Sequence, residues 1–83
     1  MSQALKVLVV EDEADVRLAL SVLLSRVGLD VVEAGDGRAG LRALFAEHPD
    51  CVILDVGLPD LDGWEVLGRI RDVSEVPVLM LTA

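Results

Sequence analysis

Short apolar runs alternate with longer segments of helical periodicity along this chain, and this alternation limits the fold more than any other feature. Four runs predict strands at residues 6–10, 30–34, 51–54 and 78–81. Most of them consist of Val, Ile and Leu without polar alternation, which is typical of strands buried on both faces of a parallel sheet. The apolar run in segment 30–34 is shorter than the others, and the segment has more polar ends.

Each segment between two strands predicts one helix. The first begins near Ala14, behind three acids that suit the positive end of a helix dipole, and Gly28 follows its last turn. Asp36 can cap the second helix, and the third ends near Asp72. Each helix carries an apolar stripe that is expected to face the core, with Phe45 and Trp64 as anchors. The stripes are Val16, Leu20, Leu23, Leu24 and Val27 on the first helix, Leu41, Leu44 and Phe45 on the second, and Trp64, Leu67 and Ile70 on the third.

The element order βαβαβαβ predicts a parallel sheet with helices on both faces. On such sheets, ligands bind beyond the carboxyl ends of the strands, where the strand order reverses. Three strands place polar residues at that end: Glu11 and Asp12 follow the first, Asp55 the third and Thr82 the fourth. The second strand ends in Ala34, which suits a strand outside the site.

If the first and third strands are neighbours, Glu11, Asp12 and Asp55 converge at one rim. Crowded carboxylates raise one another's pKa unless a cation intervenes, and Mg²⁺ is the natural candidate for such an oxygen site. An aspartate beside Mg²⁺ can attack phosphorus and form an acyl phosphate. Thr82 could then donate a hydrogen bond to a phosphoryl oxygen.

A purely structural interpretation of the same residues stays open. Acids after buried strands often cap helices, so Asp12 could simply begin the first helix. The Thr82 hydroxyl could be satisfied by backbone, and Cys51 is expected to be a small core residue. His48 suits the negative end of the second helix as a cation. Because all the acids fall at one end of the predicted sheet, we favour the functional interpretation.

Charge and composition exclude several classes of function. Fifteen acids against seven bases give a net charge of −8, which argues against nucleic-acid or anionic-membrane binding by this chain. With 53% hydrophobic residues the chain is expected to fold. It contains neither a membrane-spanning run nor a signal peptide, and the lone Cys51 excludes an internal disulfide. A cytoplasmic setting is therefore expected.

Three motifs together resemble the receiver domain of bacterial two-component response regulators. They are VLVVEDE at residues 7–13, ILDVGLPDLDG at 53–63 and PVLMLTA at 77–83, and the resemblance runs from about Leu5 to the last residue. It implies a flavodoxin-like, doubly wound parallel sheet. It also implies that Asp55 accepts a phosphoryl group from the phosphohistidine of a sensor histidine kinase, with Thr82 as the switch hydroxyl and the Ala83 amide holding the phosphoryl group. The implied Mg²⁺ ligands are Asp12, Asp55, the backbone carbonyl of Gly57 and, through water, Glu11.

The departures from that family suggest a partial domain. Receivers usually continue with a fourth helix, a fifth strand carrying a lysine and a switch aromatic, and a fifth helix, so residues 1–83 are expected to form a truncated receiver without a second domain. The only lysine, Lys6, lies at the opposite end of the first strand and cannot replace the missing one. Phosphorylation is then expected to be slow or poorly coupled to any output. Gly57 stands where the family more often has a larger side chain, which leaves the site more open.

The leading hypothesis is a phosphoacceptor receiver, not an enzyme, that controls an output such as transcription in a longer parent protein. The alternative is a phosphorylation-independent interaction module that self-associates, for example as a swapped dimer, through an unpaired fourth strand. An aspartate-nucleophile phosphatase is disfavoured. Such enzymes usually carry a second acid two residues after the nucleophile, where this chain has Gly57.

Overall fold

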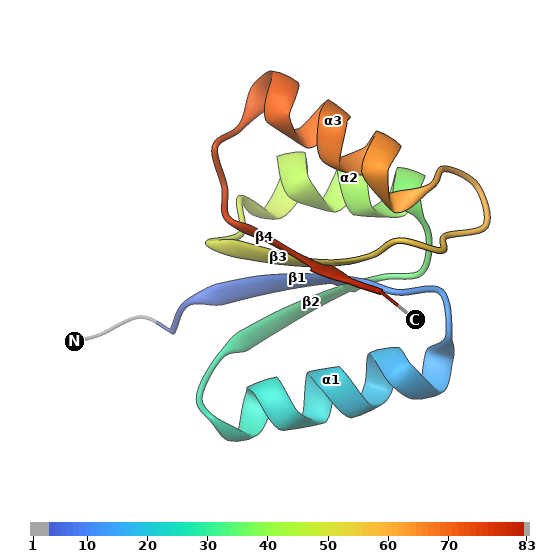
Figure 1. Ribbon diagram of the computed structural model, residues 1–83. Helices are drawn as coiled ribbons and strands as arrows, with labels where there is room; N and C mark the ends of the chain where they lie inside the picture. Colours follow the sequence, from blue (N-terminus) through green and yellow to red (C-terminus); the bar gives the residue numbers. More distant parts are fainter. Residues whose placement is uncertain (1–3, 83) are drawn as a thin grey trace.

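The chain folds into a four-stranded parallel sheet with helices on both faces. The computed structural model describes residues 4–82. Strands and helices alternate along the chain, as predicted (Figure 1). In chain order the elements are β1 (Lys6–Val10), α1 (Ala14–Arg26), β2 (Asp30–Ala34), α2 (Gly37–Glu47), β3 (Cys51–Asp55), α3 (Gly63–Val73) and β4 (Val78–Leu81).

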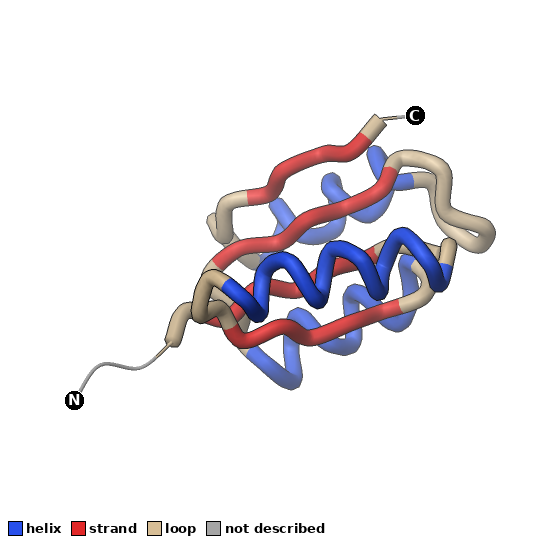
Figure 2. The backbone as a smooth tube through the Cα atoms, turned by 90° about the horizontal axis from the view of Figure 1, so that it is seen from below, coloured by secondary structure: helices blue, strands red, loops and turns tan. Residues whose placement is uncertain are grey.

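The strand order is β2-β1-β3-β4, and the strands run parallel (Figure 2). The chain adds β2 on one side of β1 and then crosses to place β3 on the other, so the order reverses at β1. Val10 is level with Ala34 of β2 and with Leu54 of β3. The carboxyl ends of β1 and β3 therefore lie side by side, which confirms the arrangement that the sequence predicted.

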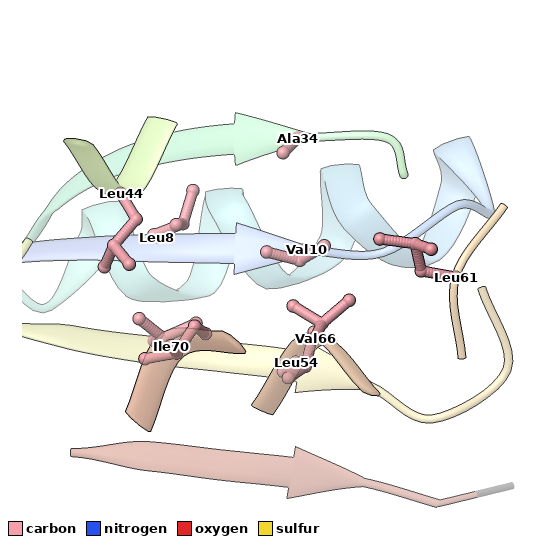
Figure 3. Close-up of a cluster of buried hydrophobic side chains, with 9 residues drawn as sticks. Leu8, Val10, Ala34, Leu44, Leu54, Leu61, Val66 and Ile70 are labelled. Atoms are coloured by element: carbon pink, nitrogen blue, oxygen red, sulfur yellow. The ribbon is translucent and has the colours of Figure 1, made fainter. Parts of the chain in front are cut away.

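The sheet divides the core into two clusters. On the face covered by α2 and α3, Leu8, Val10 and Leu54 pack against Leu44 and Ile70 (Figure 3). On the face covered by α1, Val7, Val9 and Ile53 are buried with Leu20 and Leu24 against them. Because β1 and β3 contribute to both clusters, their Val-rich and Leu-rich sequences are buried on both sides.

The predicted stripe of α1 is only partly correct. Leu20 and Leu24 pack on the sheet, but Val16, Leu23 and Val27 are exposed, Val27 at 74%. The helix lies over β1 and β2 and leaves β3 and β4 uncovered on this face (Figure 2). A single helix on this face of the sheet can bury only its narrow inward side. The remaining apolar positions of α1 therefore point to solvent.

Phe45 and Trp64 were expected to anchor the core, and this expectation is wrong. Their side chains are 59% and 57% exposed. Successive helix residues are rotated by about 100°. Leu44 and Val66 occupy the inward positions of α2 and α3, so the aromatic rings one and two residues away are turned outward.

The predicted helix ends are confirmed. The Asp36 carboxylate accepts a hydrogen bond of 2.7 Å from the Ala39 N–H and caps α2. Gly28 follows α1 with a φ of 90°, and His48 ends α2 with a φ of 48°, in the left-handed region. Cys51 is half-buried beside the core cluster on the face covered by α1. Within residues 4–82, no helix has the length and apolar content needed to cross a membrane.

Candidate functional site

Three carboxylates meet at the carboxyl edge of the sheet. Glu11 and Asp12 follow β1 directly, and Asp55 is the last residue of β3. One carboxylate oxygen from each lies within 4.8 Å of the others. Glu11 is buried, Asp55 half-buried and Asp12 exposed, so the cluster runs from the protein interior to the surface. The structure thus brings together the three acids that the sequence singled out.

Glu11 is held at the buried end of the cluster by its own backbone and side chain. Its N–H donates to the Ala34 carbonyl at 3.0 Å, and its carboxylate accepts from the Glu13 N–H at 3.0 Å. Burial raises the pKa of Glu11, the bond from Glu13 lowers it, and Asp12 and Asp55 raise it further. The net direction is upward, chiefly because Glu11 is buried, and the two neighbouring acids add to the effect.

The interpretation of Asp12 as a helix cap is not supported by the geometry. Helix α1 begins at Ala14, and the residue in the capping position is Glu13, whose side chain makes no capping hydrogen bond. Asp12 lies one residue before that position, with its side chain in the carboxylate cluster. Its placement beside Asp55 therefore needs an explanation other than capping.

The cluster opens into a cleft of about 690 Å³, with Gly57, Leu81 and Thr82 among the other lining residues. The Val56 N–H donates to the Leu81 carbonyl at 3.1 Å, which joins the loop after β3 to the end of β4. A Cβ atom at Gly57 would meet no atom within 4 Å, so the cleft is open at that point. Thr82 is exposed at the rim, and Ala83 lies outside the described residues.

This donor set fits a hard divalent cation. Carboxylate and carbonyl oxygens are the ligands that Mg²⁺ prefers, with waters filling its remaining positions. Two of the three carboxylates are open to the cleft, which leaves room for those waters. Gly57 lines the same cleft, next to Asp55 and Val56.

Sequence reasoning missed two residues that shape this edge. The Arg17 guanidinium donates to the Glu11 carbonyl at 2.7 Å and to the Glu33 carboxylate at 3.3 Å. The Asp60 carboxylate accepts hydrogen bonds from three backbone N–H groups. The available signal for Asp60 was an acid inside the turn-rich segment 57–63, which predicted a loop but not the partner that the loop holds.

Known proteins share both this sequence and this architecture. Residues 7–83 match the response regulator receiver domain family. A probable transcriptional regulator ycf27 from Guillardia theta is 50% identical over 78 residues, which are 94% of this chain and 31% of that protein. The chain spans about a third of the length of the curated relatives it matches.

Solved structures agree. The N-terminal domain of a response regulator receiver protein from Methanoculleus marisnigri is 40% identical, with a TM-score of 0.91 over 94% of this chain and 66% of that one. The BeF3-activated receiver domain of Klebsiella pneumoniae RstA is 31% identical, with a TM-score of 0.89 over 93% and 66%.

Fold and site together define a doubly wound parallel α/β domain with an acidic cluster at its switch point. The sequence match makes the assignment specific: the chain belongs to the response regulator receiver domain family. This confirms the resemblance and the flavodoxin-like fold predicted from the sequence.

Proposed function

We propose that this chain receives a phosphoryl group on Asp55 from the phosphohistidine of a sensor histidine kinase and passes the signal to an output, most simply transcription, in a longer protein. The observation that carries the proposal is the convergence of Glu11, Asp12 and Asp55 within 4.8 Å at the switch point of the sheet. Two of the relatives are named as probable transcriptional regulators, which supports this kind of output.

The proposed transfer needs one nucleophile and a bound cation. A carboxylate oxygen of Asp55 attacks phosphorus, the bond from phosphorus to the imidazole nitrogen breaks, and that nitrogen keeps the electron pair. Mg²⁺, held by Asp12, Asp55 and the Gly57 carbonyl with Glu11 through water, would neutralise the charge of the phosphoryl oxygens. Asp55 is half-buried yet lines the open cleft, so its oxygen is accessible to the donor.

Thr82 is the proposed switch hydroxyl. It lies at the rim of the same cleft, directly after β4, where its hydroxyl can donate to a phosphoryl oxygen on Asp55. The Val56–Leu81 hydrogen bond joins the two strand ends, so a shift at Asp55 reaches the Thr82 backbone over a short path. The Ala83 amide is proposed as a further donor to the phosphoryl group on the basis of the sequence resemblance.

A Mg²⁺ titration with and without beryllofluoride tests the proposal. Trp64 is a suitable fluorescence probe, because it follows Gly63, whose N–H donates to the Val56 carbonyl at 2.8 Å. We expect a saturable response that beryllofluoride extends. Asp55→Asn should lose both effects, and Asp72→Asn, which removes an exposed charge at the far end of α3, should keep them.

Intact mass provides a second measurement on the same variants. After incubation with Mg²⁺ and a small phosphodonor such as acetyl phosphate, the wild-type chain should gain one phosphoryl group and Asp55→Asn none. Equal labelling of the two proteins would show that Asp55 is not the phosphoacceptor.

A second function, phosphorylation-independent self-association, is favoured by β4. Within residues 4–82 this strand pairs with β3 alone, and Leu79, whose side chain lies on the same face of the sheet as its partner Ile53, is 57% exposed. Open apolar edges promote strand pairing between chains. We expect sedimentation to show dimers that Leu79→Lys dissociates; a monomeric wild-type chain at high concentration would contradict this.

A further inference from the structure

The loop between β3 and α3, residues 56–62, is fixed firmly at its two ends. At its start, the Gly63 N–H donates to the Val56 carbonyl at 2.8 Å, and a Cβ atom at Gly63 would lie 2.6 Å from the Val56 Cα. Near its end, Leu61 is buried with Val10 and Val66 in the core cluster on the face covered by α2 and α3 (Figure 3). Gly57 lies between these two anchors.

The Asp60 carboxylate adds a third anchor, and this one reaches a different element. One oxygen accepts from the Gly37 and Leu61 N–H groups, both at 2.8 Å, and the other accepts from the Arg38 N–H at 2.9 Å. Gly37 and Arg38 are the first two residues of α2, whose N–H groups have no acceptor within the helix. The loop is therefore bound to the N-terminus of a helix 22 and 23 residues earlier in the chain.

The approach at this contact is close. A Cβ atom at Gly37 would lie 3.2 Å from the Asp60 carboxylate, 3.1 Å from the Leu61 Cβ and 2.9 Å from Val66. Loss of some hydration raises the pKa of Asp60, but the bonds from Arg38, Gly37 and Leu61 outweigh it and lower the pKa to about 2. The carboxylate is thus charged and fully engaged near neutral pH.

Asp60 accepts from the first two N–H groups of α2, whereas Asp36, the residue that precedes the helix, serves a different one. Asp36 accepts from the Ala39 N–H at 2.7 Å within the same segment. Asp60 instead connects α2 to the loop that carries Gly57. Gly57 has no packing contact of its own at the side-chain position, since a Cβ there would meet nothing within 4 Å. The position of its carbonyl is therefore set by the anchors on either side.

We propose that Asp60 is a positioning residue for the metal site: by joining the β3–α3 loop to the N-terminus of α2, it holds the Gly57 carbonyl at the cleft. This inference rests on the proposed Mg²⁺ site. It assigns to Asp60 a role in metal affinity that is separate from its contribution to stability. Groups that orient metal ligands typically affect metal affinity by about 10- to 100-fold.

A matched pair of variants tests the inference. Asp60→Ala and Asp36→Ala each remove a carboxylate from the N-terminus of α2, but only the first releases the loop. We expect both to lower the melting temperature. Mg²⁺ titrations read by Trp64 fluorescence, well below either melting temperature, should show an increase in Kd of about tenfold for Asp60→Ala and little change for Asp36→Ala.

Asp60→Asn covers the case in which the alanine variant does not fold. An amide keeps one acceptor oxygen of the three-bond arrangement, so its Kd should fall between those of wild type and Asp60→Ala. If Asp60 variants bind Mg²⁺ as tightly as Asp36→Ala, the positioning role is refuted while the metal site stands. If the wild-type chain shows no saturable Mg²⁺ response, or Asp55→Asn responds equally, the proposed site itself fails and the inference fails with it.

Discussion

Replacing Asp12 by Asn should stabilise this chain without Mg²⁺ and remove most of the stabilisation that Mg²⁺ provides. The carboxylate oxygens of the cluster lie within 4.8 Å of one another, and at that limiting distance two like charges repel by about 0.9 kcal/mol in bulk water and by about 3.5 kcal/mol at an effective dielectric constant of about 20. Asp12 is exposed, so its repulsion energy with each neighbouring carboxylate is closer to the lower of these two values. Glu11 is its neighbour in sequence and repels it in the unfolded chain as well, which leaves the pair with Asp55 as the main folding-specific cost.

The expected gain is therefore about 1–2 kcal/mol in EDTA. For a domain of this size, about 1 kcal/mol corresponds to roughly 4–8 °C in melting temperature, so Asp12→Asn should melt roughly 4–16 °C higher than wild type. With Mg²⁺ at about a hundred times its Kd, the wild-type chain should gain about 2.7 kcal/mol, and the variant much less. The order of stability then reverses between the two conditions.

Thermal melts by circular dichroism, in EDTA and in Mg²⁺, measure both effects. Asp15→Asn is the matched control, because Asp15 lies in the first turn of α1 outside the carboxylate cluster. It should be neutral or slightly destabilising in EDTA and should keep the Mg²⁺ response. Salt near 1 M, where the Debye length is about 3 Å, should reduce the advantage of Asp12→Asn. An Asp12→Asn chain no more stable than wild type in EDTA would refute the charge-crowding argument.

Three further outcomes follow from particular contacts. Gly63→Ala should lower the unfolding free energy by about 1–3 kcal/mol, because the added Cβ overlaps the backbone of β3. Gly68→Ala, in open space on the same helix, should raise the unfolding free energy by about 1 kcal/mol. Urea midpoints compare the two variants, and equal shifts would contradict the overlap. Because the pKa of Asp60 is lowered from 3.8 to about 2, its stabilisation is complete above the unfolded value and disappears as the pH falls through the folded one. The urea midpoint of wild type minus that of Asp60→Asn should therefore shrink between about pH 4 and pH 2, and a constant difference would count against the role of the charge. Gly57→Leu fills open space at the cleft and should slow hydrolysis of phosphorylated Asp55 several-fold by limiting water, which phosphate release measures; unchanged hydrolysis would show that water enters elsewhere.

Periodicity and strand-end chemistry predicted most of this fold and the core of its site. Buried strands impose a simple pattern, because both faces must be apolar and the polar residues collect where the strand ends. That is why β1, β3 and the acids Glu11, Asp12 and Asp55 could be placed from the sequence. The Asp36 cap was predictable for a similar reason, since its partner lies only three residues away.

The errors concern faces and distant partners. Phe45 and Trp64 lie within apolar stripes, but which of several apolar residues on a helix points inward depends on how the helix sits on the sheet. The stripe of α1 was misjudged because the sequence did not show that the helix lies over β1 and β2 only. Asp60 was missed because its acceptor role depends on N–H groups 22 and 23 residues away, which no local pattern reveals.

The strand order has a consequence for how the sheet can assemble during synthesis. β1 leaves the ribosome first and becomes an interior strand, and β2 then adds to one of its edges. β3 adds to the other edge, and β4 adds to β3. Each new strand thus joins a free edge, and none has to be inserted between two strands that are already paired. During synthesis the earlier strands become available for pairing before the later ones. This sheet can therefore grow outward in the order of translation. The carboxyl end of β1, with Glu11 and Asp12 after it, is then already in place when Asp55 arrives beside it.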